Sequence, residues 1–241
     1  MKISKIEVEN YDGYVYDLSV SKNHNFLANG YVIHNCGKKN YVCRVHSSEG
    51  VRYAKPKYKT MGIALVRSST PKLVQDDLRD SLEIIFNGGE KATQQFIQKV
   101  KSKFMTYPAT GVARPSSANN IENFSSPRSI YKSGADGTTP IHIRGSLLYN
   151  HHIKEMDLTS KYDFIRDGDK VKYIILKTPN PIRENVIAFP ADSDLPPEFG
   201  LDKYIDWEEN FEKTFVSSIR NMIEPIGWTT EEISSLQDFF G

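Results

Sequence analysis

The strongest helical pattern of the 241-residue chain lies at residues 69–104, which read STPKLVQDDLRDSLEIIFNGGEKATQQFIQKVKSKF. Apolar side chains recur at helical spacing on both sides of an Asn-Gly-Gly break, at Leu73, Val74, Leu78, Leu82, Ile85 and Phe86 before it and at Phe96, Ile97, Val100 and Phe104 after it. Thr70 fits the N-cap of the first helix and Pro71 its first position. Because Asn87-Gly88-Gly89 stops a helix, the pattern predicts two helices joined by a short turn.

The segments on either side of this helix pair differ from it. Residues 36–67 favour extended structure, whereas 107–139 are rich in Pro, Ser, Asn and Gly and are interpreted as a long loop or a partly ordered excursion. We further expect a helix over 141–156, strands over Val171–Lys177 and Val186–Phe189, and helices over 206–223 and 229–240. The part beyond residue 35 is therefore predicted to be mainly helical α+β.

Residues 1–35 have a different pattern, in which apolar and polar side chains alternate. Turns are indicated at Asp12-Gly13, Lys22-Asn23 and Asn29-Gly30. This pattern predicts a small all-β piece, which is too short to build a core of its own. The chain is therefore expected to be multi-domain.

Charge is unevenly distributed along a chain whose formal net charge is +1. A basic stretch, broken only by Glu49, contains Lys38, Lys39, Arg44, Arg52, Lys55, Lys57, Lys59, Arg67 and Lys72. The last fifty residues are instead dominated by Asp and Glu. The basic stretch favours an anionic partner, or it is a solvated face.

Two further features concern the compartment. The start is β-patterned rather than a signal peptide, and no apolar run is long enough to cross a membrane, so no membrane partner is expected. The two cysteines, Cys36 and Cys43, provide no disulfide framework and favour a reducing compartment.

The tripeptide His34-Asn35-Cys36 contains three groups that can cut and rejoin a peptide bond. The side-chain amide of Asn35 can attack its own main-chain carbonyl and close a succinimide ring. The thiol of Cys36 can accept an acyl group from a thioester, and His34 can polarise the adjacent carbonyl or donate a proton.

Residues 1–36 resemble the two C-terminal sequence blocks of an intein, with an ordinary β-hairpin domain as the alternative. The resemblance rests on Val15–Leu18, His24–Phe26, Asn29-Gly30 and Val32–Cys36. It implies a Hint-like fold in which His24 and Asp17 tune Cys36, although His24 could be a turn histidine and Asp17 structural. Because the N-terminal blocks are missing, 1–35 looks like the C-terminal segment of a split intein that awaits a separate N-terminal half; a truncated protein is the alternative.

Residues 38–241 resemble the C-terminal end of the family-B DNA polymerases of T-even-like bacteriophages. The resembling segments are Lys38–Tyr41, Val51–Lys57, Met61-Gly62, Arg67–Lys72, Pro140–Gly145, Leu148–Asn150, Pro179–Pro181 and Ile187–Pro190. The resemblance implies a palm-to-thumb connection over 36–68 with a Lys-Lys-x-Tyr element, and a thumb domain over 69–230.

A polymerase holds duplex DNA through phosphates, which requires Lys, Arg and helix N-termini. The expected DNA-binding residues are Lys38, Lys39, Tyr41, Arg52, Lys55, Lys57, Ser69, Thr70, Lys72 and Arg144. Two alternatives remain: Tyr41 could be a core tyrosine, and Arg144 could form a structural salt bridge.

The polymerase active site is expected on another chain. Family-B polymerases bind two metal ions through palm aspartates, and those motifs are missing from 36–241. We therefore expect no cofactor on this chain, and Mg²⁺ on the N-terminal part of the assembled polymerase. The pair His151-His152 faces different ways on a helix and has no carboxylate at matching spacing, so no metal site is predicted there.

Residues 231–241 resemble the C-terminal sliding-clamp-binding peptide of the same polymerases. Leu236, Phe239 and Phe240 would fit a hydrophobic pocket on the clamp, and the acidic flank would steer the encounter. The alternative is an amphipathic helix that folds back on its own core.

Together these resemblances imply the C-terminal precursor of a phage replicative DNA-directed DNA polymerase, a nucleotidyltransferase once assembled. Splicing at Asn35/Cys36 would join it to an N-terminal polymerase and intein half in the cytoplasm of the infected bacterial host. The alternative is a stand-alone DNA- and clamp-binding subunit that associates non-covalently and carries an inert intein relic. The intact His34-Asn35-Cys36 argues against this alternative.

Overall fold

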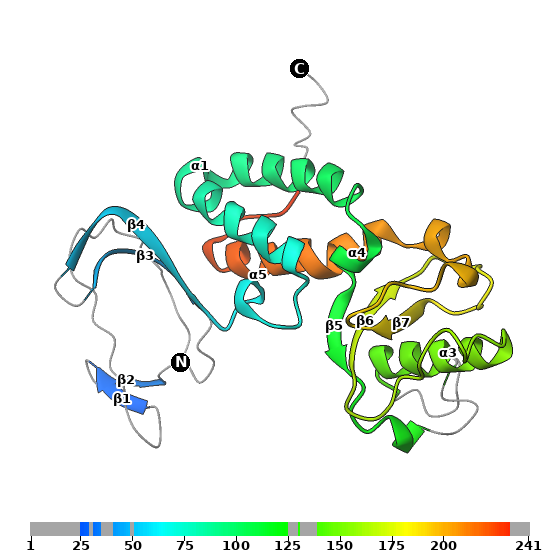
Figure 1. Cartoon of the computed structure of the whole chain (residues 1–241). Helices are drawn as coiled ribbons and strands as arrows, with labels where there is room; N and C mark the ends of the chain where they lie inside the picture. Colours follow the sequence, from blue (N-terminus) through cyan, green and yellow to red (C-terminus); the bar gives the residue numbers. More distant parts are fainter. Residues whose placement is uncertain are drawn as a thin grey trace. The chain divides into compact units, whose positions relative to one another are not determined.

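The computed structural model describes residues 25–28, 31–34, 41–48, 51–124, 130 and 139–231 (Figure 1). The chain divides into two compact units, Met1–Lys39 and Asn40–Gly241. In the first unit, β1 (Asn25–Ala28) pairs antiparallel with β2 (Tyr31–His34), and Asn25 lies opposite His34. The strands expected on either side of Asn29-Gly30 are thus confirmed, whereas the Hint-like fold depends on residues before 25, which lie outside the described ones.

The second unit begins with a two-stranded antiparallel sheet of β3 (Tyr41–Ser48) and β4 (Val51–Met61), which confirms the extended structure expected there. Cys43 pairs with Lys59, and Arg44 with Tyr58. Cross-strand partners share a face and successive residues alternate between faces, so Lys59 and Tyr58 lie on opposite sides of this hairpin.

Helix α1 (Lys72–Phe104) consists of two arms that meet at Gly89, where φ is 77° and ψ is −176°. Residues with a Cβ rarely adopt this conformation, so the break predicted at Asn87-Gly88-Gly89 is confirmed. The predicted cap is wrong by one residue. Pro71 is the N-cap, because its extended backbone (φ −57°, ψ 143°) precedes the first helical residue, Lys72.

A buried carboxylate holds the two arms of α1 against each other. Asp77 is 2% exposed and accepts hydrogen bonds from Nζ of Lys103 at 2.7 Å and from the hydroxyl of Tyr107 at 2.9 Å. The hydrogen bond to Asp77 raises the pKa of Lys103, so the lysine keeps its charge at neutral pH.

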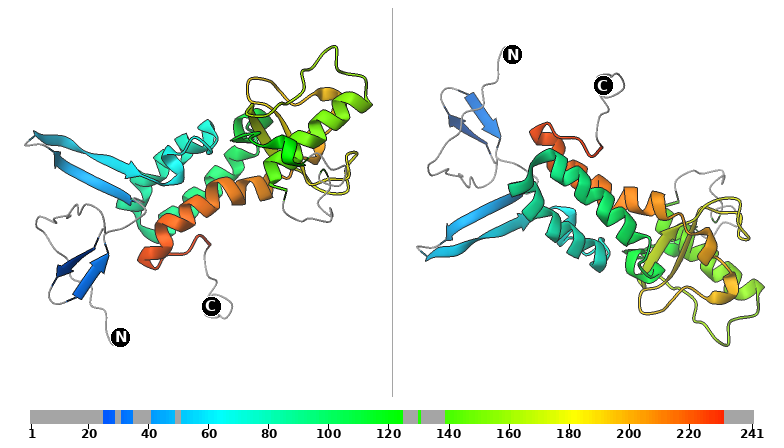
Figure 2. Two further views of the ribbon diagram at one scale, coloured as in Figure 1. Left: turned by 90° about the horizontal axis from the view of Figure 1, so that it is seen from below. Right: turned by 90° about the horizontal axis from the view of Figure 1, so that it is seen from above.

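A second helical run lies beside α1 (Figures 1 and 2). It comprises α4 (Trp207–Phe211), the π-helical turn η5 (Glu212–Val216) and α5 (Ser217–Ile223), and it confirms the helix expected over 206–223. The ring of Phe104 meets those of Trp207 and Phe211 edge to face. The helix expected over 229–240 does not begin by residue 231, and its remainder lies outside the described residues.

A three-stranded antiparallel sheet forms the other side of this unit, in the order β5 (Arg114–Ser117), β6 (Lys170–Ile175), β7 (Val186–Pro190). Helix α3 (Ile141–Glu155) packs on β7, and a Cβ on Gly145 would stand 2.9 Å from the backbone nitrogen of Ala188. This close approach requires glycine. The predicted helix over 141–156 and both predicted strands are confirmed.

The interpretation of 107–139 as a long loop is wrong for 109–124. This segment contains α2 (Ala109–Val112), β5 and the 3₁₀ helix η2 (Ile121–Phe124). Pro115 cannot donate to a ladder, and it is tolerated because β5 is an edge strand of the sheet. Four more 3₁₀ helices link the other elements: η1 (Ala64–Val66), η3 (Pro197–Phe199), η4 (Asp202–Tyr204) and η6 (Glu224–Ile226).

Two buried polar contacts stabilise the sheet. Asn210 of α4 exchanges two hydrogen bonds with the backbone of Ile175, at 3.1 and 2.9 Å, which joins the helical run to β6. Arg144 of α3, 6% exposed, donates to Glu184 at 2.9 Å and to Asn185 at 2.8 Å. Burial lowers the pKa of Arg144, and the carboxylate of Glu184 opposes this shift.

In the described part of the chain, none of the helices could span a membrane.

The Asp77 contact predicts a large stability effect. Asp77→Ala removes two hydrogen bonds, one of them to a charged group, and should lower the free energy of unfolding by about 2 kcal/mol. Asp76→Ala is the matched control, because Asp76 is half exposed and makes only surface ion pairs. Its effect should stay within about 0.5 kcal/mol. Urea denaturation measures both, and equal effects would contradict a role for Asp77 in joining the arms.

Arg144 offers a second test. Arg144→Ala leaves the Glu184 carboxylate buried without its arginine and should cost about 3 kcal/mol of unfolding free energy. Arg166→Ala, at an exposed position, should change it little. If thermal or urea unfolding of the Arg144 variant matches that of the wild type, the buried ion pair has no structural role.

Candidate nucleic-acid interface

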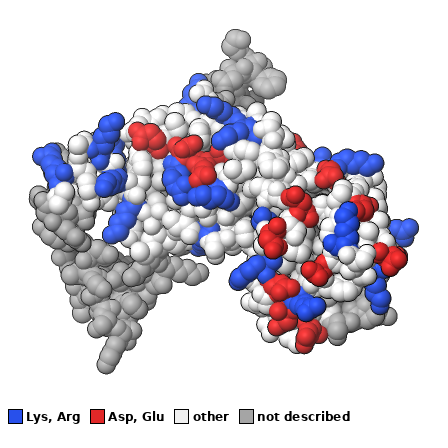
Figure 3. All heavy atoms as spheres, in the orientation of Figure 1, with Lys and Arg blue, Asp and Glu red and all other residues white. Residues whose placement is uncertain are grey.

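The hairpin of β3 and β4 carries a basic surface. Lys55, Lys57 and Lys59 are exposed on β4, as is Arg52. The described residues of both strands include no Asp or Glu. In Figure 3 the visible charged side chains over β3 and β4 are Lys and Arg, whereas acidic and basic groups are intermixed around α3 and the three-stranded sheet.

The lysines of this surface are free to meet an external anion. Nζ of Lys57 lies 4.3 Å from the ring centroid of Tyr53, a cation–π contact that orients the side chain. Among the described residues, no carboxylate lies within ion-pair distance of Lys55, Lys57 or Lys59. Within the described part of the chain, no carboxylate therefore neutralises these lysines.

The opposite face of the hairpin is fastened to the first arm of α1. The hydroxyl of Tyr58 donates to Glu83 at 2.5 Å, and its ring stacks on Phe86 with centroids 5.2 Å apart. The hydrogen bond to Glu83 raises the pKa of Tyr58, so the hydroxyl keeps its proton at neutral pH. Arg44 donates to Asn87 at 3.0 Å. These contacts fix where the basic surface lies on the helices.

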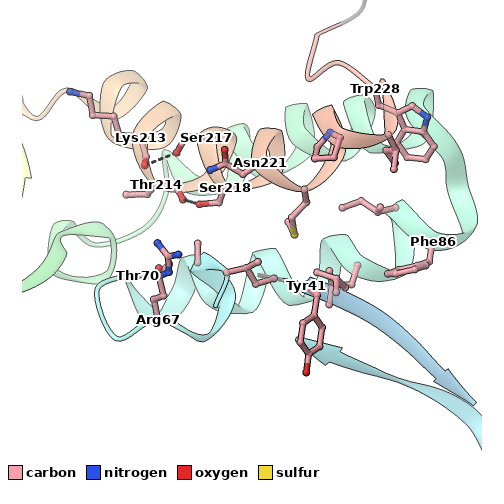
Figure 4. A pocket seen from close by; sticks show the side chains of 18 of the residues that line it. Tyr41, Arg67, Thr70, Phe86, Lys213, Thr214, Ser217, Ser218, Asn221 and Trp228 are labelled. Carbon is pink, nitrogen blue, oxygen red and sulfur yellow. Dashed lines mark hydrogen bonds between the residues drawn. The ribbon is translucent and has the colours of Figure 1, made fainter. Parts of the chain in front are cut away.

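A groove of about 1090 Å³ opens between the first arm of α1 and α5 (Figure 4). Arg67, Arg114 and Lys213 line one end, although the ammonium of Lys213 points away from the space between the helices (Figure 4), and the described residues that line the groove include no Asp or Glu. The other end is aromatic and apolar, with Phe86 and Trp228 facing each other across it. The groove can therefore attract an anion at one end and accept an apolar or aromatic group at the other.

The sequence-predicted DNA residues fall into separate places. Tyr41, Ser69 and Thr70 all line the groove. Tyr41 is half-buried at its rim, and the ring points away from the space between the helices (Figure 4). Lys72 lies in an adjoining hollow of about 510 Å³ with Lys172. Arg52, Lys55 and Lys57 lie on the hairpin.

The assignment of Arg144 to DNA is wrong, because its guanidinium is buried against Glu184; the structural alternative holds. His34 ends β2, and nothing further is described of its side chain. The other predicted residues lie outside the described ones. They are Asp17, His24, Asn35, Cys36, Lys38, Lys39, Leu236, Phe239 and Phe240.

The helical run after residue 206 supplies one wall of the groove, which the sequence did not predict. Thr214, Ser217, Ser218 and Asn221 follow one another at i, i+3, i+4 and i+7, and all four line the groove. Ser217 and Ser218 donate to carbonyls one turn back, at 2.9 and 2.7 Å, so they form a narrow uncharged wall (Figure 4). The four side chains recur at helical spacing, and this periodic signal is visible in the sequence.

The described part of the chain brings no three His, Cys, Asp or Glu side chains together as metal ligands. His151 and His152 both approach Glu155, at 3.4 Å, on the surface of α3.

Comparison with known proteins adds two findings. Residues 1–35 match the family model of the intein splicing domain. The chain is also 32% identical over 206 residues, 85% of its length, to a DNA-directed DNA polymerase of Enterobacteria phage T4, and 32% identical over 208 residues to that of Escherichia phage RB69. It spans 22% of the length of each of these two relatives.

A third relative matches a shorter stretch. Elongation factor 2 of Methanopyrus kandleri is 49% identical over 35 residues, which are 14% of this chain and 3% of that protein. The chain therefore combines an intein splicing segment with a segment related in sequence to the DNA-directed DNA polymerases of phages T4 and RB69.

Proposed function

We propose that this chain is the C-terminal precursor of a phage replicative DNA polymerase, joined to its N-terminal part by protein trans-splicing. One observation carries this proposal: the intein match ends at residue 35, which is the asparagine of His34-Asn35-Cys36. The relative from phage T4 matches 206 residues, and 206 residues follow position 35. The two lengths support a border between the segments at this tripeptide.

The chemistry requires three transfers. The Cys36 thiol attacks a thioester of the N-terminal part, takes over its acyl group and releases the first thiol. The side-chain nitrogen of Asn35 then attacks its own carbonyl carbon, which breaks the Asn35–Cys36 bond and frees the Cys36 amine. That amine attacks the new thioester and forms a peptide bond, while His34 supplies or receives the protons. His24 and Asp17 are proposed to tune Cys36.

On this proposal, residues 69–230 act as a thumb that holds primer-template duplex, together with the connection over 36–68 that precedes it. The exposed lysines of β4, which belong to the connection, support duplex binding, because duplex is held through its phosphates. Among the described residues that line the groove there is no carboxylate, which supports the same assignment. Lys38, Lys39 and Tyr41 are proposed to belong to the same surface. Mg²⁺ would be held by aspartates of the N-terminal part, so polymerase activity would belong to the assembled enzyme. That enzyme would act in the host cytoplasm.

The C-terminal residues 231–241 are proposed to bind the sliding clamp. The first residue of this segment and a residue just before it are anchored: Nε2 of Gln94 donates to the carbonyl of Glu231 at 2.9 Å, and the amide of Thr229 donates to Glu90 at 2.7 Å. Because these contacts fix the point where residues 231–241 begin, they support the proposal that this segment binds a separate partner.

The rival is a stand-alone DNA- and clamp-binding subunit with an inert intein relic. This rival predicts that no ligated protein forms when the two parts are mixed, although the chain still binds duplex DNA.

The splicing proposal makes Asn35 indispensable. Asn35→Ala should abolish release of residues 1–35 in a mixture with the N-terminal part, because no side-chain amide remains to attack. Cys36→Ala should prevent ligation, whereas the control Asn40→Ala should splice normally. Intact-mass spectrometry measures all three. A ligated product of normal mass from the Asn35 variant would refute this role.

The duplex proposal predicts salt-dependent binding without sequence preference. Replacing Lys55, Lys57 and Lys59 together by Ala should weaken binding and reduce the slope of log K against log salt by about three. A matched variant with Lys154, Lys177 and Lys203 changed to Ala has the same net charge and should keep the wild-type slope. Fluorescence anisotropy of a labelled duplex measures both, and identical slopes for the two variants contradict a role for the hairpin.

The clamp proposal is tested by deleting residues 235–241. The melting temperature and short-primer extension of the spliced enzyme should stay unchanged, because these residues are proposed to bury their aromatic groups only on the partner. Stimulation of long-product synthesis by the phage clamp should be lost. A lower melting temperature with intact stimulation would show that Leu236, Phe239 and Phe240 belong to the core.

A further inference from the structure

We propose that the groove between α1 and α5 takes a short unpaired segment of a nucleic-acid strand, with phosphates at its cationic end and a base at its aromatic end. This inference rests on the proposed DNA function and adds a second site to it. A duplex held on the hairpin and an unpaired strand in the groove are then bound by different residues.

The aromatic end is a rigid platform. The amide of Trp228 donates to the carbonyl of Ile223 at 3.2 Å, and Gly227 before it has a φ of 82°. The amide of Thr229 after it donates to Glu90 at 2.7 Å. Trp228 is thus fixed from both sides. Phe86, 37% exposed, stands across the groove from it (Figure 4).

The cationic end is also preorganised. Nε of Arg67 donates to the carbonyl of Gly62 at 2.7 Å, which orients the guanidinium. The guanidinium of Arg114 lies 5.5 Å from the ring centroid of Tyr173, and Lys213 is positioned by Glu209 at 2.9 Å. The described residues that line the groove include no carboxylate, and the Glu209 carboxylate beside it is paired with Lys213, so the attraction for an anion comes from Arg67 and Arg114.

The chemistry of the two ends favours an unpaired strand over duplex. In a duplex the bases are stacked inside, so no base face is available to Trp228 or Phe86. A single strand offers one π-face per nucleotide and a phosphate beside it, the combination that cationic grooves with aromatic side chains bind. The volume of about 1090 Å³ is on the scale of a ligand cavity. It suits a few nucleotides.

Trp228 provides its own probe, because the chain has only two tryptophans. In a Trp207→Phe variant, which keeps an aromatic ring against Phe104, all tryptophan fluorescence comes from Trp228. Titration with oligo(dT) should quench this fluorescence in a saturable manner that weakens as salt rises. A duplex of equal charge should bind to the hairpin without quenching it.

Substitutions separate the two sites. Trp228→Leu should weaken oligo(dT) binding about tenfold or more, the loss of one stacked base, whereas Trp228→Phe should restore most of it. Arg67→Ala should raise the Kd for oligo(dT), and the control Lys154→Ala should not. Duplex affinity should stay within about twofold in the Trp228 variants.

Three outcomes overturn the inference: oligo(dT) leaves Trp228 unquenched while duplex still binds, duplex quenches it equally, or the N-terminal part of the polymerase quenches it and oligo(dT) does not. The last result would assign the groove to a protein partner. Failure of the proposed DNA function is distinct, because then neither duplex nor oligo(dT) binds at all.

Discussion

Gly89 turns α1 back on itself through a backbone conformation that glycine adopts without strain, and the buried Asp77 keeps the two arms together. The first arm then has two sides to offer. One side receives Tyr58 and Arg44 of the hairpin, and the other faces α5 across the groove. Both the basic surface and the groove therefore depend on a single chain reversal and on one buried carboxylate.

Phe86 connects the two surfaces physically. One face of its ring stacks on Tyr58 of the hairpin, and the side chain also lines the aromatic end of the groove. A shift of the hairpin on α1 would move this ring and change the groove. Asn210 connects the helical run to the three-stranded sheet in a similar way, through its hydrogen bonds to the backbone of Ile175. Asp77 and Asn210, the two polar side chains that join these elements, are thus buried and hydrogen-bonded.

Local patterns predicted the local structure well. Helical spacing and the Gly-Gly break located both arms of α1, and alternation located β3, β4, β6 and β7. The sequence could not reveal that Arg114–Ser117 forms an edge strand, because its Pro-Ser composition is that of a loop and only β6 makes it a strand. It left open whether Arg144 met phosphate or carboxylate, since the partner Glu184 lies forty residues away. The groove likewise joins residues from positions 41 to 228, which no single segment contains.

The central claim is that the border between the intein segment and the polymerase-related segment is a reactive junction. Its most direct test is the intact mass of the products when the wild-type chain is mixed with the N-terminal polymerase and intein part. We expect a ligated protein in which Cys36 follows the N-terminal part, and a free peptide of residues 1–35 lighter than its hydrolysed form by one water, because it ends in a succinimide. Two unchanged masses, together with normal duplex binding, would contradict the claim and leave the non-covalent subunit.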